Sequence, residues 1–370
     1  MTTIGIISTG SYLPATVVDN AEVGAEAGVS AEWIEHKTGI RQRRRAAPHE
    51  ATSDLAARAA QQALEQAGLT PQEVAYVVVA TSTPDHPQPA TAAIVQGLIG
   101  ATRAAAFDVN SVCSGFMFAM TAAERMLRAE PARDDGKGAK GPYALVIGAD
   151  IYSRILDRAD RKTAILFGDG AGAVVLGPVP SRLGGMVTNL TTRGDQHRLI
   201  SVPAGGSRRP ASAATLEEGA HYFTMDGRGV RGFVHENLPG AIHELLATAA
   251  VGGREVRHFV PHQANGVMLA EVWPDLGLDA ARMHLALAHY GNTGAASVPI
   301  TLDLAHRRGL FTEGDVTVLS AFGGGMSVGS TLLRWAPTRH ARPARHSAQA
   351  AAGLRTPSAA HREPALAGAR

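Results

Sequence analysis

The sequence contains a single cysteine, Cys113, among its 370 residues. A lone cysteine excludes an intramolecular disulfide and a multi-cysteine metal site. Charged residues make up only 18% of the chain, too few for a coiled coil or a disordered protein. No apolar run approaches the roughly 20 residues of a membrane-spanning helix. The first residues, MTTIGIISTGSYLP, lack a basic leader, so we expect no secretion signal, no membrane segment and a cytoplasmic location.

The part of the chain that we expect to fold also lacks a strong charge of either sign. The whole chain has a formal net charge of +2, of which residues 337–370 contribute +5 through six arginines and the one acid Glu363. Residues 1–336 are therefore slightly acidic, at −3, which leaves no electrostatic footprint for nucleic acid. The segment 337–370 is rich in Ala, Pro, Arg and His without periodicity, and we predict that it is a disordered basic tail.

Short apolar strands alternate with amphipathic helices over residues 1–336, a pattern typical of an α/β fold with buried sheets. The first series of predicted strands is IGIIST, VAYVVVATS, AAAFDV, YALVIGA and AILFGDGAGAVVLG, and the second is GMVTNL, HFVPHQ, MHLALA, VTVLSAFGGG and STLLRW. The two series match in order and character, which indicates an internal duplication with a boundary near residue 180. Two similar halves would bring corresponding loops to one shared site.

Cys113 lies where the strand predicted at Ala104 to Val109 turns into a helix that begins near Gly115. A single cysteine is more often an inert buried thiol than a nucleophile. A helix N-terminus, however, stabilises a thiolate, so we expect this position to lower the pKa of Cys113. The small neighbours Ser111 and Ser114 would also allow a substrate to approach closely, which favours a nucleophile.

Two candidate partners of Cys113 stand at strand ends of the second half: His262 in FVPHQAN and Asn292 in HYGNTGAASVP. Taken singly, each has an ordinary explanation, because most of the 15 histidines must lie on the surface and an Asn beside Gly usually makes a turn. Their corresponding positions in the repeat favour a shared site. A neutral His262 and Asn292 could together donate hydrogen bonds to a carbonyl that becomes enolate-like, and AFGGGM (321–326) offers backbone N–H groups to a thioester oxygen.

Six longer stretches carry a specific resemblance: WIEHKTGIRQRRRA, AFDVNSVCSGFMFAM, DRADRKTAILFGDGAGAVVLG, VPHQAN, HYGNTGAASVP and AFGGGMSVGSTLLRW. In these stretches, which follow the family order across nearly all of residues 1–336, the chain resembles a β-ketoacyl-acyl carrier protein synthase III of the thiolase-fold condensing enzymes. The resemblance implies a thiolase-like α/β fold whose two similar halves form a five-layered αβαβα arrangement. The half 1–178 would hold the nucleophile, and the half 179–336 would hold the histidine and the asparagine.

The resemblance implies a role for each matching residue. Cys113 would take an acyl group from coenzyme A, and His262 and Asn292 would stabilise the carbanion formed when malonyl on an acyl carrier protein loses carbon dioxide. The backbone N–H groups of Cys113 and Gly324 resemble the oxyanion hole of the family, and Phe322 matches the aromatic residue beside the nucleophile. The product would be a 3-oxoacyl chain for a fatty acid or a polyketide starter.

The resemblance also implies a coenzyme A site without a metal or any further cofactor. Trp33 and Arg161 match the pair that sandwiches adenine, since an indole and a guanidinium both stack on a flat ring. For Trp33, a packing role on the helix AEWIEH is the alternative. Lys37 stands where the family usually has a phosphate-binding arginine, and Gly227 and Asn265 match contacts to the pantetheine arm.

The sequence departs from the family pattern at three positions. Val267 and Gly232 replace basic residues that help to dock the carrier protein, so we expect an atypical docking surface. Gln88 stands where the family often places an apolar residue that closes the acyl pocket across a homodimer interface. These departures fit a specialised relative, and the alternative function is transfer of the acyl group to another carrier, hydroxyl or amine without decarboxylation. Retention of the Cys113, His262 and Asn292 set favours condensation.

Other classes fit the sequence less well. A papain-like protease also uses Cys, His and Asn, but its local signature around the cysteine is absent. A non-catalytic binding module would leave the glycine-rich strand ends unexplained, and a degradative thiolase would carry a second active-site cysteine. A hydroxymethylglutaryl-type synthase needs an acid before the nucleophile, for which Pro84-Asp85-His86 stays a candidate segment. A homodimer is expected from the family, with the residues that flank the Cys113 strand at its interface.

Overall fold

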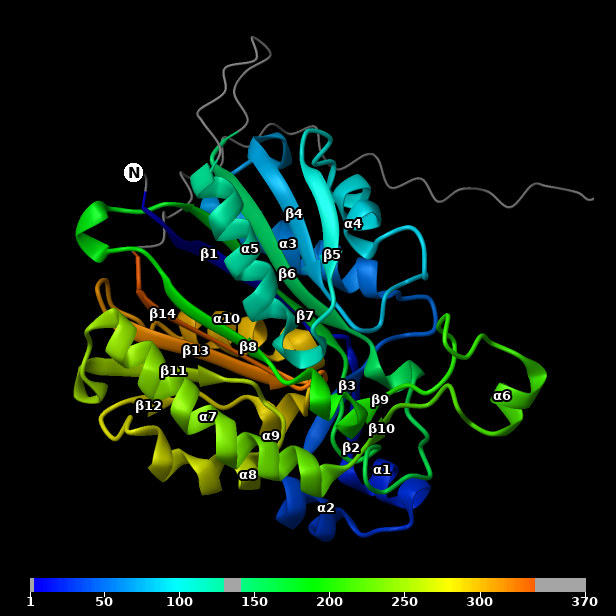
Figure 1. Ribbon diagram of the computed structural model, residues 1–370. Coiled ribbons are helices and arrows are strands. Elements are labelled where there is room, and N and C mark those ends of the chain that lie inside the picture. The colour runs from blue at the N-terminus through cyan, green and yellow to red at the C-terminus, as the bar shows by residue number, and fades with distance from the viewer. Residues whose placement is uncertain (1–2, 130–140, 337–370) are drawn as a thin grey trace, which may run out of the picture.

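The computed structural model describes residues 3–129 and 141–336, so the predicted tail 337–370 lies outside the described residues. Two five-stranded sheets form the body (Figure 1). The first has the order β1 (Ile4–Tyr12), β7 (Gly170–Pro178), β6 (Tyr143–Asp150), β4 (Val74–Ala80) and β5 (Ala105–Val109). The second has the order β12 (Arg282–Met283), β11 (Val256–Pro261), β13 (Val316–Gly323), β14 (Ser327–Arg334) and β8 (Val187–Thr192).

The two sheets have the same topology when one is read in reverse, so that β1, β7, β6, β4 and β5 correspond to β8, β14, β13, β11 and β12. In each sheet, taken in this order, the first two pairings are antiparallel and the last two are parallel. The predicted pair of similar α/β halves is therefore confirmed. The chain passes from the first sheet to the second between β7 and β8, the interval in which the boundary was expected near residue 180.

Helices separate and cover the sheets to give five layers (Figure 1). The apolar faces of α3 (Thr52–Ala67) and α4 (Thr91–Ile99) pack on the outer face of the first sheet. Those of α7 (Gly227–Ala249) and α8 (Gly266–Val272) pack on the outer face of the second. Between the sheets lie α5 (Gly115–Ala129) and α10 (Ser297–Arg307), whose side chains share one core with strands of both. The order of layers is thus αβαβα, as the resemblance implied.

The remaining strands and helices lie in the segments that connect the elements of these five layers. They are β2 (Thr16–Asp19), β3 (Gln42–Arg45), β9 (Ile200–Ser201), β10 (Thr224–Met225), α1 (Asn20–Ala27), α2 (Ala31–Thr38), α6 (Ala213–Glu217) and α9 (Leu287–Tyr290). Eight short 3-10 turns complete the described chain: η1 (Pro71–Glu73), η2 (Val112–Ser114), η3 (Tyr152–Arg154), η4 (Ser181–Leu183), η5 (Gly194–Leu199), η6 (Gly253–Glu255), η7 (Trp273–Leu276) and η8 (Gly294–Ala296). No helix in the described ranges has both the length and the apolar character needed to cross a membrane.

Two predicted strands are wrong in extent. Within the segment MHLALA only Met283 pairs with β11, together with Arg282 just before it, and the chain enters α9 at Leu287. The side chain of Gln263 takes the place of a strand partner here, because its Oε1 accepts hydrogen bonds from the N–H groups of Ala286 (2.8 Å) and Leu287 (3.2 Å). The strand predicted at AILFGDGAGAVVLG starts only at Gly170, since the residues before it form turns.

Glycines let the central layer approach the first sheet closely. A Cβ added at Gly148 on β6 would lie 2.3 Å from the carbonyl oxygen of Ala295, and one at Gly172 on β7 would lie 2.5 Å from the nitrogen of Ile300. Real Cβ atoms do not approach backbone atoms so closely, so only glycine fits at either position. These two contacts set the depth at which the turn before α10, from the second half, meets the first half.

Replacing Gly148 by alanine should therefore destabilise the fold by about 1–3 kcal/mol, because the added methyl group meets backbone that cannot rotate away. Chemical denaturation measures the effect. Gly97→Ala in α4 is the matched control, since a Cβ there has no atom within 4 Å and a helix gains from the change. A Gly148→Ala variant as stable as the wild type would contradict this account of the packing.

Candidate active site

Cys113 lies in η2, at the turn between β5 and α5. The preceding Val112 has φ of 48°, which is a strained conformation for a β-branched residue. Gly323, at the end of β13, presses on this turn from the second half, because a Cβ there would lie 2.7 Å from the nitrogen of Cys113 and 2.8 Å from that of Ser114. The strained turn is thus clamped between the two halves, with the thiol side chain only 6% exposed.

The thiol of Cys113 is not activated in the resting enzyme. Burial, and secondarily the negative charge of Asp150, raise its pKa to about 12, against which a hydrogen bond from Tyr152 acts weakly. The sequence-based expectation of a lowered pKa is therefore wrong for this state. That expectation rested on the helix N-terminus alone, whereas the burial of the side chain has the larger effect on the pKa of the thiol. The proton must leave while the substrate occupies the site.

Behind the thiol, Asp150 at the end of β6 is fully buried and ties together loops of both halves. Its Oδ1 accepts hydrogen bonds from Ser82 N (2.9 Å) and Thr83 Oγ1 (2.8 Å), while Oδ2 accepts one from Ala295 N (2.8 Å). Burial raises the pKa of Asp150 and these hydrogen bonds oppose the rise. The sequence reasoning missed this residue, although an acid at the end of an apolar strand was a visible signal.

Tyr152 was also missed, and it touches the nucleophile. Its hydroxyl lies 4.0 Å from Cys113 Sγ and 2.9 Å from Ser82 Oγ. Its ring stacks on Phe167 at 4.3 Å between centroids and meets the edge of Phe223 at 5.6 Å. The rings of Phe167 and Phe223 therefore hold in place the tyrosine that lies next to the sulfur.

His262 stands at the end of β11 and is 1% exposed. Burial lowers the pKa of its imidazole to about 3, so the ring is neutral at physiological pH. Its Nδ1 lies 2.6 Å from Ser297 Oγ, and that oxygen accepts a hydrogen bond from the N–H of Gln263 (3.4 Å). When the Ser297 hydroxyl donates its hydrogen to Nδ1, the proton of the neutral ring stands on Nε2 and is free to be donated. Ser297 contacts the ring of His262 directly, which the sequence reasoning missed.

Asn292 is held by the backbone of the first half. Its N–H donates to Leu166 O (2.8 Å) and its carbonyl accepts from Gly168 N (2.9 Å). The side-chain Oδ1 accepts a hydrogen bond from Gly294 N (2.9 Å), so the side-chain NH₂ is left as the donor that can face a ligand. Asn292 and His262 therefore both present N–H groups, as the predicted donor pair requires.

The glycine turn after β13 borders the nucleophile. Phe322 is buried, and its ring meets the imidazole of His262 edge to face at 5.2 Å between centroids. Gly324 follows the clamping Gly323, and a Cβ at Gly324 would touch the side chain of Val112 at 3.0 Å. The second half thus brings Phe322 to His262 and Gly324 to Val112, the residue before Cys113, and the role of these residues in an oxyanion hole stays a prediction.

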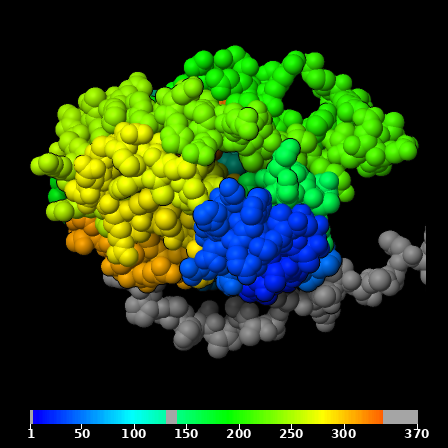
Figure 2. All heavy atoms as spheres, turned by 90° about the horizontal axis from the view of Figure 1, so that it is seen from below, coloured from blue at the N-terminus to red at the C-terminus, as the bar shows by residue number. Residues whose placement is uncertain are grey.

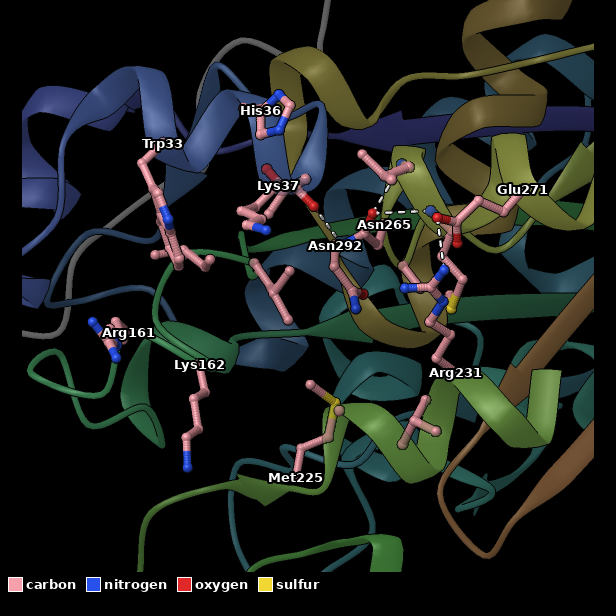
Figure 3. A pocket seen from close by; sticks show the side chains of 18 residues that line it. Trp33, His36, Lys37, Arg161, Lys162, Met225, Arg231, Asn265, Glu271 and Asn292 are labelled. Atoms are coloured by element: carbon pink, nitrogen blue, oxygen red, sulfur yellow. Dashed lines mark hydrogen bonds and ion pairs between the residues drawn. The ribbon is translucent and has the colours of Figure 1, made fainter. Parts of the chain in front are cut away.

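A cavity of about 1080 Å³ leads from the surface to Asn292. The predicted coenzyme A residues Trp33, Lys37, Arg161, Gly227 and Asn265 all line it. Figure 3 shows Trp33 and Arg161 on one side of this cavity and Asn292 at its centre. In the space-filling view the surface is hollowed where α2, α8 and the start of α7 meet (Figure 2).

Gln88 does not line this cavity. It lies exposed on the loop before α4, at a cis bond to Pro89. Its predicted role at an acyl pocket concerns a second copy of the chain and stays a prediction. Within residues 3–129 and 141–336, no group of His, Cys, Asp and Glu side chains has the arrangement of a metal site.

The raised pKa of Cys113 predicts that its reactivity depends on pH differently from that of an ordinary cysteine. Because the pKa of Cys113 lies near 12, its thiolate fraction should grow about tenfold per pH unit throughout the range from 7 to 9. Alkylation by iodoacetamide, followed by intact mass, should accelerate in the same way, and the chain has no other thiol to interfere. His262 stays neutral in this range and adds no second titration. A rate that levels off at or below about pH 8.5, the ordinary pKa of cysteine, would contradict the raised value.

Two family profiles match the chain. The profile described as "3-Oxoacyl-[acyl-carrier-protein (ACP)] synthase III" matches residues 107–194, and its C-terminal counterpart matches residues 246–335. These ranges contain Cys113 in the first case and both His262 and Asn292 in the second.

Similar proteins cover nearly all of the described chain. Acetoacetyl CoA synthase NphT7 of Streptomyces sp. (strain CL190) is 54% identical over 332 residues, which cover 89% of this chain and 98% of that protein. A β-ketoacyl-[acyl-carrier-protein] synthase III of Caldanaerobacter subterraneus subsp. tengcongensis is 40% identical and covers 90% of this chain and 97% of its own length. The crystal structure of 3-oxoacyl-(acyl carrier protein) synthase III, FabH, from Pseudomonas aeruginosa PAO1 superposes with a TM-score of 0.80 at 37% identity, covering 91% of this chain and 99% of that one. The chain belongs to the 3-oxoacyl-[acyl-carrier-protein] synthase III family.

Proposed function

We propose that this condensing acyltransferase takes an acyl group from coenzyme A onto Cys113 and joins it to a malonyl thioester with loss of carbon dioxide. One observation carries the proposal: Asn292 lines the cavity that Trp33 and Arg161 also line, and the buried Cys113 and His262 both lie against the end of β13, Cys113 at Gly323 and His262 at Phe322. A nucleophile alone would support acyl transfer. The added donors support stabilisation of an enolate, which only a carbon–carbon bond-forming step requires.

The first step is transfer of the acyl group. The sulfur of Cys113 attacks the thioester carbonyl, the bond to the coenzyme A sulfur breaks, and the thiol proton leaves with that sulfur as coenzyme A thiol. The N–H groups of Cys113 and Gly324 would hold the carbonyl oxygen while it carries negative charge. Because the resting thiol is protonated, we propose that loss of its proton is coupled to this attack.

The second step is decarboxylation and condensation. The malonyl carboxylate leaves as carbon dioxide, and the electron pair of the broken bond forms an enolate on the thioester. His262 Nε2–H and the side-chain NH₂ of Asn292 would donate to the enolate oxygen, as neutral donors that need not give up a proton. The enolate carbon then attacks the acyl group, and the bond to the Cys113 sulfur breaks. The sulfur leaves as a thiolate, which takes up a proton from water to restore the resting thiol. Apart from this proton, the reaction draws on the two thioesters alone.

The acyl group that fits is short. Tyr152 is buried with its hydroxyl 4.0 Å from Cys113 Sγ, and its ring packs against the buried rings of Phe167 and Phe223. A ring held in this position leaves little room on this side of the sulfur for a long alkyl chain. We therefore propose acetyl as the preferred starter, with discrimination against chains of six carbons or more.

A second candidate concerns the carrier of the malonyl unit. At the positions expected to dock the carrier protein, Val267 is 39% exposed and Gly232 has no side chain, and the neighbouring cation Arg231 is paired with Glu271 at 2.8 Å. These positions offer little to an acidic carrier protein, and three cations of this surface that are unpaired within the described residues, Lys162, Arg198 and Arg228, lie together around a separate hollow. This observation favours malonyl-coenzyme A as an acceptor beside malonyl on an acyl carrier protein. The printed name of the 54% identical relative, an acetoacetyl CoA synthase, has a coenzyme A product.

We further propose a homodimer that pairs along β5, the edge strand of the first sheet, whose residues are half-buried to exposed in the single chain. This pairing would bring Gln88 of one copy toward the acyl site of the other. Sedimentation at the mass of one chain would contradict the homodimer.

A reducing compartment such as the cytoplasm suits the lone thiol, which must stay reduced to react.

The proposed function predicts a covalent intermediate. Intact mass after incubation with acetyl-coenzyme A should show one acetyl adduct on the wild type and none on Cys113→Ser. Malonyl-coenzyme A and malonyl carrier protein, added separately, should each be tested for release of carbon dioxide. Release from either supports condensation and identifies the acceptor. An adduct without release from either would instead support transfer to another nucleophile, and no adduct would contradict the acyl-enzyme.

The three-ring cluster predicts chain-length selection. Replacing Tyr152 by leucine should raise the ratio of kcat/KM for hexanoyl- over acetyl-coenzyme A by about tenfold, since space for a few methylene groups is worth about 1–3 kcal/mol. Tyr152→Phe is the matched control: it keeps the ring and removes only the hydroxyl, so it should retain the preference for acetyl. The cluster does not select the chain if the wild type accepts both substrates equally or if Tyr152→Leu leaves the ratio unchanged.

A further inference from the structure

A second hollow of about 670 Å³ lies beside the main cavity. Lys162, Met225 and Gly227 line both, so they form a shared wall between them. In Figure 3, Lys162 points away from Lys37 and Asn265, on the same side of the view as Met225. A ligand that occupies the outer part of the main cavity can therefore extend a group past this wall.

The second hollow is strongly cationic. Lys162, Arg198 and Arg228 line it, and the side chains of these three residues make no ion pair or hydrogen bond with any other described residue. Its one acid, Asp226, caps its own helix, because Oδ1 accepts hydrogen bonds from the N–H groups of Arg228 (3.1 Å) and Gly229 (3.0 Å). Three cations thus face one carboxylate, which is a charge arrangement suited to a dianion.

The segments that carry these cations are fixed relative to one another. The N–H of Asp226, at the start of α7, donates to the carbonyl of Leu199, next to Arg198 (2.9 Å). The ladder of β9 and β10 continues this link through Ile200 and Met225. Lys162 lies on a turn that its own N–H closes onto Asp160 Oδ1 (3.0 Å). The backbone therefore holds the segments of Arg198 and Arg228 together before any ligand arrives, and Lys162 lines the same hollow from its own turn.

We propose that this hollow binds the 3′-phosphate of coenzyme A. The proposal rests on the proposed function, which places the adenine between Trp33 and Arg161, and thereby the adenosine ribose beside Lys162, the next residue in the chain. Coenzyme A carries a diphosphate and a separate phosphomonoester on that ribose. Lys37 lines the main cavity and is available to the diphosphate, whereas Arg198 and Arg228 lie beyond the shared wall.

The consequence is specificity for one kind of thioester. The pantetheine arm of a carrier protein has no adenosine 3′-phosphate, and neither has 3′-dephospho-coenzyme A. The cationic hollow thus distinguishes free coenzyme A thioesters from every carrier that shares only the pantetheine arm. Arg198 and Arg228 are specificity-determining residues in this account, remote from the reacting sulfur.

Calorimetric binding of coenzyme A and of 3′-dephospho-coenzyme A tests the proposal without requiring turnover. The wild type should bind coenzyme A about tenfold more tightly, since a charged phosphate gains a few hydrogen bonds to exposed cations. In the double variant Arg198→Gln, Arg228→Gln this preference should fall to less than about twofold, through weaker binding of coenzyme A alone. Arg254→Gln, an exposed arginine on η6 outside both linings, is the matched control and should keep the preference.

Equal binding of the two ligands by the wild type would overturn the proposal, as would a double variant that keeps the preference or loses both ligands equally. Failure of the proposed function has a different signature. In that case Cys113 stays free of acetyl in the presence of acetyl-coenzyme A, while the preference for the 3′-phosphate in binding is still measurable.

Discussion

The site depends on one buried carboxylate, Asp150, which joins the two halves of the molecule at the nucleophile. It sits at the end of β6 and accepts hydrogen bonds both from the loop after β4 and from Ala295, at the turn that opens α10. A buried charge is stable only when such donors surround it, so the loops have no freedom to move apart. The close approach of Ala295 to Gly148 completes the joint. Asn292 precedes this turn, and Tyr152 follows Asp150 by two residues.

Burial sets the reactivity of Cys113, and the same carboxylate adds to it. The burial of the thiol, and secondarily the negative charge of Asp150, keep the sulfur protonated, so the resting enzyme holds an unreactive thiol. Burial lowers the pKa of His262 instead, so that its imidazole stays neutral. Both effects follow from placing these side chains in the central layer between two sheets. A neutral His262 and Asn292 leave their N–H donors free for the charge that develops on the substrate.

The duplicated topology explains how the chemistry is divided. The corresponding helices α5 and α10 begin side by side between the sheets, one preceded by Cys113 and the other by Asn292. His262 ends β11, the counterpart of β4, whose following loop binds Asp150. Each half alone would present an incomplete set of groups. The duplication brings the nucleophile and the donors to one place because equivalent loops meet at the pseudo-symmetric centre.

Much of this was predictable from the sequence, since alternating apolar strands and helices indicated two matching halves, and the resemblance placed Cys113, His262 and Asn292 at strand ends. The raised pKa of Cys113 was not predictable, because the burial of its thiol depends on Gly323 and other residues far away in the chain. Tyr152 and Ser297 were missed because each acts through a contact across the fold: Ser297 lies within HYGNTGAASVP, but its contact with His262 spans 35 residues, and that of Tyr152 with Cys113 spans 39. The early end of the strand at Met283 results from the side chain of Gln263, which no period of apolar residues reveals.

The central claim is that the nucleophile and the donor pair serve different steps. The most direct measurement compares Asn292→Ala with the wild type in two single-turnover assays, acetylation of Cys113 by acetyl-coenzyme A and release of carbon dioxide from the malonyl thioester. The account predicts that carbon dioxide release falls by on the order of 100-fold, as for loss of an oxyanion donor, while acetylation changes by less than about threefold. Equal losses in both steps would contradict the division of roles.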